Sequence, residues 1–174
     1  MANSRIISEL KNKVTKMIIN DEELIKAIDP PNYTNDDWEE IYMINSVETE
    51  KAGYKPVIYR EHQNPNMITE TMTFLTIEVN IPENYNTPEF FKYPQLEIWI
   101  VSHNKHNRID NIPGVRDNRN DYISILLDEK FNGESAGIGS LKLVSNTAGI
   151  YDDKFIYRRL AFQGIDLSDS ICES

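Results

Sequence analysis

The sequence has little of several residue types on which common protein chemistries depend. Its 174 residues include one cysteine, Cys172, three histidines and seven glycines. A lone cysteine excludes a disulfide within the chain, as is usual for proteins kept in a reducing cytoplasm. No apolar run approaches the roughly 18 residues of a membrane span, and the N-terminus does not read as a signal peptide. We therefore expect a soluble protein with no membrane partner.

An excess of positive charge is also missing. The chain carries 28 acidic and 18 basic side chains, a formal charge of −10. A field of that sign repels nucleic-acid phosphates, so sequence-independent DNA binding is not expected. Hydrophobic residues make up 40% of the chain, which is typical of a globular protein. The length fits a single domain over residues 1–174, with a flexible acidic tail at about 167–174.

Apolar residues at spacings of three and four predict two main helices. One is an amphipathic N-terminal helix that ends near Ile18, and the second covers about 118–131. A short helix over 21–28 should end at the two prolines that follow it. The region 30–53 is polar, with at most a helical turn at 35–43.

Alternation of apolar and polar residues predicts the strands. The clearest is 71–81, where Leu75, Ile77 and Val79 should form its one buried face. It should pair antiparallel with 95–101, and a closing hairpin should follow the second helix. Further strands are expected at 55–61, 138–145 and 153–165, with a turn region at 146–153. This order predicts an α+β fold, a mainly antiparallel β-sheet with both main helices packed on one face.

The connection between the two clearest strands is too long for an ordinary hairpin loop. It is expected to form a long hairpin arm over 82–95, and it carries four aromatic residues, Tyr85, Phe90, Phe91 and Tyr93. These aromatics either fold back on the core or dock on a neighbouring subunit, since exposed aromatic side chains are costly for a free monomer.

Candidate catalytic residues are few. His103 and His106 form an H-x-x-H pair near Asp110, but the pair follows a strand in a loop and lacks the i, i+4 spacing of a helical zinc site. Glu78 and Glu97 lie on neighbouring strands, where a magnesium-dependent nuclease would hold carboxylates, yet no lysine follows two residues later. We therefore expect no catalytic residue, cofactor or metal, and hence no enzyme.

Glycine and arginine patterns add two further expectations. The glycines at 137 and 139 precede a strand, so they do not form a phosphate cradle at a helix. Arg158 and Arg159 should point to opposite faces of their strand, with one exposed and the other paired to a local acid such as Asp152 or Asp153, or to a neighbouring subunit.

Two segments, 108–134 and 137–167, resemble small neck and tail-completion proteins of tailed phages from low-GC Gram-positive bacteria. Among these the tail terminator is the most similar in its order of elements, while head-closure and adaptor proteins remain competitors because the region 30–53 is longer than expected. The resemblance implies a structural protein of the virion neck, assembled in the host cytoplasm. It would form a hexameric ring between the tail tube protein and the head connector or head-closure protein, and DNA would pass the lumen without specific binding.

That interpretation predicts contacts with further copies or partners through the aromatic arm and through Arg108, Arg116, Arg158 and Arg159. Two alternatives stay open. A metal-dependent nuclease or other small cytoplasmic enzyme would depend on Glu78 with Glu97, or on the histidine pair. A monomeric cytoplasmic binding module would remain a single molecule with a small partner.

Overall fold

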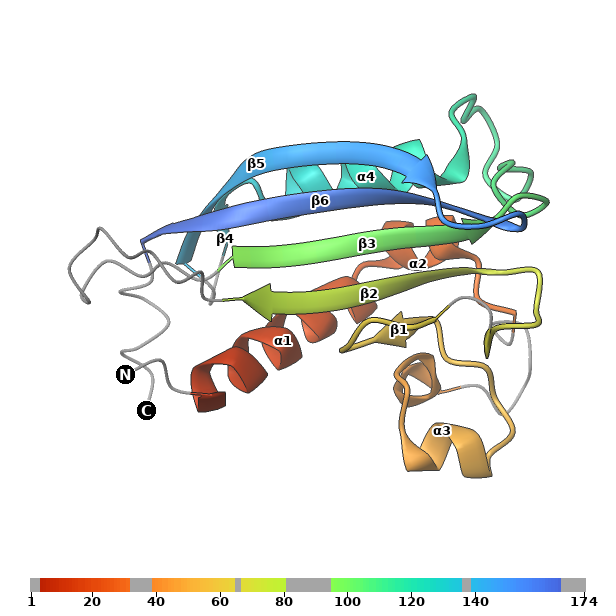
Figure 1. Cartoon of the computed structure of the whole chain (residues 1–174), viewed down its shortest axis with the longest axis horizontal. Helices are drawn as coiled ribbons and strands as arrows, with labels where there is room; N and C mark the ends of the chain where they lie inside the picture. The colour runs from red at the N-terminus through yellow and green to blue at the C-terminus, as the bar shows by residue number, and fades with distance from the viewer. Residues whose placement is uncertain (1–3, 32–38, 65–66, 81–94, 136–138, 167–174) are drawn as a thin grey trace.

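The computed structural model, which describes residues 4–31, 39–64, 67–80, 95–135 and 139–166, shows an α+β fold with one sheet (Figure 1). This confirms the predicted fold class. The helices, including one 3₁₀ helix, are α1 (Ser4–Ile19), α2 (Glu22–Ile28), η1 (Glu40–Met43), α3 (Val47–Lys51) and α4 (Arg119–Phe131). The strands are β1 (Ile58–Tyr59), β2 (Thr73–Asn80), β3 (Gln95–His103), β4 (Gly133–Ser135), β5 (Gly139–Ile150) and β6 (Phe155–Asp166).

The strands lie in the order β1-β2-β3-β6-β5-β4. Every neighbouring pair is antiparallel except β1 with β2, which is parallel. The pairing of β2 with β3 and the closing hairpin of β5 with β6 confirm the predictions. The predicted strand over 55–61 is wrong in length, because only Ile58 and Tyr59 pair with β2. The predicted turn at 146–153 is also too long, since β5 continues to Ile150.

Helices α1, α2 and α4 lie on one side of the sheet, behind it in Figure 1. The apolar stripe of α1 is buried there, with Val14 and Ile18 fully inaccessible. Side chains cap two of these helices, because Asp21 accepts a hydrogen bond from the backbone N–H of Leu24 in α2 and Asn118 accepts one from the backbone N–H of Asp121 in α4. These helices and the sheet face beneath them enclose the main hydrophobic core.

None of the helices in the described part of the chain lies on the second face of the sheet, yet part of this face is also buried. On β2, Phe74 and Thr76 are as inaccessible as Leu75 on the helix side. The prediction of one buried face for this strand was therefore wrong. The cause is aromatic packing, because the Phe74 ring meets the rings of Tyr59 and Phe155 edge to face.

Candidate interaction site

The loop between β3 and α4 forms an open pocket of about 540 Å³. Its lining includes two apolar side chains, Ile109 and Val115, and two arginines, Arg108 and Arg116. Both arginines are exposed, and neither forms an ion pair with any residue in the described ranges. Both arginines are predicted contact residues, and the structure brings them together at one pocket.

The buried side chain of Arg119 anchors this loop. Arg119 is the first residue of α4 and is completely buried. Its guanidinium donates hydrogen bonds to the backbone carbonyls of Ala27, His106 (2.7 Å) and Arg108 (3.3 Å), and to the side chain of Asn111 (3.2 Å). The planar fork of donors suits such a set of acceptors. The loop is therefore joined to the end of α2 and to the start of α4.

Asp29 supplies the negative charge that a buried arginine needs. Its carboxylate lies 3.6 Å from the guanidinium of Arg119 and 3.3 Å from Nε2 of His106. The pKa of Asp29 lies below its ordinary value, chiefly because His106 donates a hydrogen bond and also because Arg119 is close. Burial lowers the pKa of Arg119, but the nearby Asp29 and Asp110 act in the opposite direction.

His106 also begins a buried chain of hydroxyl groups. Its Nδ1 lies 2.8 Å from Oγ1 of Thr73, which lies 2.7 Å from Oγ of Ser102. The order of Asp29, His106 and a hydroxyl is that of a hydrolase triad. Both hydroxyl residues are fully buried, however, so a substrate has no access to them in this conformation. These hydrogen bonds instead connect β2 and β3 to the loop. The hydroxyl of Ser102 donates a further hydrogen bond to the side chain of Asn120 in α4.

The two histidines that were considered for a metal site, His103 and His106, lie in different surroundings. His103 meets the ring of Phe155 edge to face, while His106 turns to Asp29, so the H-x-x-H pair does not converge. Among the described residues, no group of three or more histidine, cysteine, aspartate or glutamate side chains could hold a metal ion.

Glu78 and Glu97 do lie directly opposite each other on β2 and β3. Each carboxylate is paired with a cation of the chain. Lys11 of α1 lies 2.7 Å from Glu78, and Arg159 donates two hydrogen bonds to Glu97 at 2.7 and 2.9 Å. These bonds hold the pKa of Glu97 below its ordinary value. Both carboxylates are therefore engaged by cations from other elements of the chain.

Arg158 and Arg159 point to opposite faces of β6, as predicted, but their partners differ from those expected. Arg158 reaches across the helix side to Asp121 of α4, and Arg159 reaches Glu97. Neither pairs with the aspartates at 152 and 153. Both partners come from other elements, because a strand side chain meets its cross-strand and cross-layer neighbours before it meets residues of its own turn.

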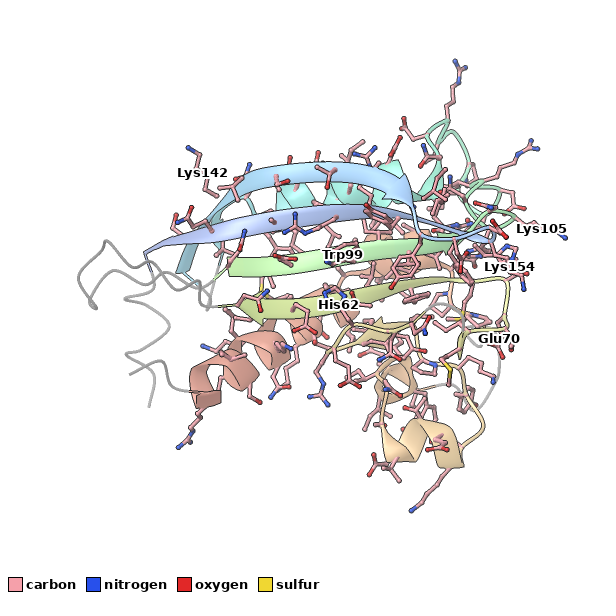
Figure 2. All side chains as sticks on the ribbon, viewed as in Figure 1. His62, Glu70, Trp99, Lys105, Lys142 and Lys154 are labelled. Atoms are coloured by element: carbon pink, nitrogen blue, oxygen red, sulfur yellow. The ribbon has the colours of Figure 1, made fainter. Side chains whose placement is uncertain are left out.

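The helix-free face of the sheet carries a half-exposed aromatic cluster. The Trp99 ring packs on Tyr157 at 4.9 Å and meets His62 at 5.2 Å, and the guanidinium of Arg159 lies 5.8 Å from the indole centroid. Figure 2 shows Trp99 and His62 side by side over the strands. Because no helix covers it, we call these four residues the open-face cluster.

Some expectations fall outside the described residues, and some structural features had no sequence signal. The four aromatics of the 82–95 arm and the acidic tail lie outside the described ranges. The buried role of Arg119 and the cluster around Trp99 were not predicted. The only available hint was that Trp99 alternates with buried residues of β3, which placed it on the opposite face.

The fold and these surfaces define an α+β protein with one helix-covered sheet face and an arginine-lined pocket at one end. The described residues contain no helix long and apolar enough to cross a membrane. The chain belongs to the YomW family, whose model matches residues 21–163. The family takes its name from a Bacillus phage gene, and membership associates the chain with phage. Searches of curated proteins and of solved structures gave no match.

Proposed function

We propose that the chain is a structural protein of the phage head–tail interface. In this proposal it forms a ring that terminates the tail tube and joins it to the head connector, with DNA passing through the lumen unbound. The observation that carries the proposal is the open-face cluster, in which Trp99 and Tyr157 are only partly buried on a sheet face that none of the described helices covers. Large aromatics on an exposed sheet face are typical of surfaces that bury against another protein.

Three further observations are compatible with an assembly role. Membership of a family named after a phage gene gives the biological setting. The residues that could have formed a nuclease site, Glu78 and Glu97, are held instead by Lys11 and Arg159. The chain's charge of −10 is compatible with DNA sliding past without adhesion.

The proposal is tested in phage particles. Mass spectrometry of purified virions should detect the chain in a fixed copy number relative to the tail tube protein, and deletion of its gene should leave separate heads and tails. Its absence from purified virions, or normal joined particles after deletion, would refute the proposal.

A point variant tests whether the open-face cluster is the assembly surface without removing the whole chain. Trp99→Ala removes the centre of the open-face cluster, while Ile125→Ala removes an exposed apolar side chain of α4, on the other side of the sheet, as a control. We expect the Trp99 variant to fold and to lose incorporation into particles, with the control incorporated normally. Equal incorporation of both variants would exclude the cluster as the assembly surface.

A further inference from the structure

We infer that the pocket lined by Arg108 and Arg116 in one chain binds the acidic segment 39–53 of a second copy. Each copy would then contact the next through two different surfaces. This inference rests on the proposed function only in taking assembly as its purpose. It assigns a role to the long polar region that the resemblance to tail terminators leaves unexplained. A head-to-tail contact uses two different surfaces, and repetition of it closes a ring or extends a filament.

The pocket supplies the positive half of the contact. Arg108 and Arg116 have no ionic partner among the described residues, and Ile109 and Val115 form the apolar part of the lining. Figure 2 places Lys105 and Lys154, together with Glu70, at the same end of the molecule. The charged side chains that line the pocket itself are Arg108, Arg116 and Asp117, so its lining is net positive in a chain with ten more acids than bases and attracts an acidic surface.

Segment 39–53, here called the acidic knob, supplies the negative half. It contains four glutamates and one lysine, and none of the glutamates forms an ion pair within the described ranges. Its two exposed apolar side chains, Ile41 (51% exposed) and Val47 (60% exposed), match the apolar part of the pocket. Charge and apolar contact therefore agree between the two surfaces.

The acidic knob is firmly attached. The side chain of Met43 is buried in the core, and the hydroxyl of buried Thr49 donates a hydrogen bond to the carbonyl of Ile44 at 2.6 Å. The rings of Tyr42 and Tyr54 stack at 4.5 Å. Rigid surfaces lose less conformational entropy on binding than mobile ones. The pocket is held equally firmly by Arg119.

The two surfaces lie apart on the molecule. In Figure 1 the acidic knob, with α3, lies beyond the β1 edge of the sheet, and the pocket loop lies beyond the end of β3 near α4. Both can therefore engage different neighbours at the same time. This separation favours a second copy as the occupant, because each chain then offers one basic and one acidic surface.

The test is a charge exchange measured by sedimentation velocity. One variant carries Arg108→Glu and Arg116→Glu, and another carries Glu48→Arg and Glu50→Arg. Each variant alone faces like charges across the contact, so its self-association should weaken about tenfold or more. Mixed in equal amounts, the two variants should associate again, as should a single chain that carries all four changes. A control with Lys16→Glu and Lys142→Glu, which lie outside both surfaces, should behave as the unchanged chain.

The possible outcomes separate the two proposals. Recovery of association in the mixture supports the inference, because only complementary surfaces restore it. Unchanged association of both charge variants overturns the inference and leaves the ring proposal standing. A wild-type chain that stays monomeric at high concentration also overturns the inference, while virion composition still decides the proposed function. Association of the wild type only with another phage protein identifies that protein as the occupant instead, and overturns self-docking.

Discussion

Arg119 allows the most exact prediction of stability. Arg119→Met keeps much of the volume of the side chain but removes four hydrogen bonds and the charge beside Asp29. The ionic contact itself contributes only about 0–1 kcal/mol, because the side chain of Asp29 is 40% exposed and solvent screens its charge. The backbone carbonyls of Ala27 and His106 would also lose their charged donor, and such bonds contribute about 1.5–3 kcal/mol each. These losses are not additive, because they share one guanidinium.

We therefore expect Arg119→Met to lower the free energy of unfolding by about 3–5 kcal/mol, mainly through the lost hydrogen bonds to backbone carbonyls. With a urea dependence of about 2 kcal/mol per molar, the midpoint should fall by roughly 2 M. The stability of Arg119→Lys should lie between those of the unchanged protein and Arg119→Met, because one ammonium group cannot reach every acceptor that the planar guanidinium binds.

Two controls make the assay specific. Arg108→Ala and Arg116→Ala remove exposed arginines from the same loop, so each should change stability by less than about 0.5 kcal/mol. Hydrogen exchange should rise across residues 104–118 in the Arg119 variant and remain unchanged in the controls. A loss below about 1 kcal/mol for Arg119→Met would refute the view that this side chain holds the loop.

Three further variants test other parts of the structure. Glu97→Gln should cost about 1–2 kcal/mol at pH 7, because Arg159 loses its charged partner. The folded-state pKa of Glu97 is depressed, so its contribution is present above the unfolded pKa of about 4.3 and is lost as the pH falls through the folded value. Urea unfolding between pH 7 and pH 2 should therefore show a flatter pH dependence for the variant. Gly149→Ala should displace Tyr157, whose hydroxyl oxygen would lie 2.6 Å from the new Cβ, at a cost of about 1 kcal/mol and with altered tryptophan fluorescence. Ile18→Ala should cost about 2–4 kcal/mol in thermal unfolding, and a loss below about 1 kcal/mol would contradict burial of α1 on the sheet.

The sequence predicted elements that are governed by periodicity. The stripe that contains Val14 and Ile18 defines α1, and the alternation around Ile77 and Ile98 defines β2 and β3. In these elements each buried position recurs with the period of the backbone, so that local pattern and tertiary burial agree.

Elements set by pairing could not be predicted in the same way. Residues 146–150 contain asparagine, threonine and glycine, which favour a turn locally, yet they extend β5 because β6 offers a full row of partners from Ile156 to Leu160. The three-residue β4 has no periodicity of its own and exists only by pairing with β5. Tertiary pairing outweighs local preference in such segments.

The candidate site shows the same division. Arg108 and Arg116 could be proposed as contact residues from the sequence, and they line one pocket, but their contact with a partner stays a prediction. The buried state of Arg119 depends on acceptors from α2, ninety-two residues earlier in the chain, as at Ala27. Nothing local in the sequence distinguishes these three arginines, because burial is decided by the packing of α2 against α4.

The buried arginine and the two exposed arginines of the loop would contribute differently to binding. The donors of Arg119 bind acceptors within the chain, whereas Arg108 and Arg116 form no ion pair with any described residue. A loop held by one buried arginine presents the other two without having to be ordered on contact, which lowers the entropic cost of association. Loosening the loop should therefore weaken self-association even where both exposed arginines remain. Sedimentation velocity of the Arg119→Met variant should show weaker self-association. An unchanged association constant for the folded variant would show that Arg108 and Arg116 act without the support of Arg119.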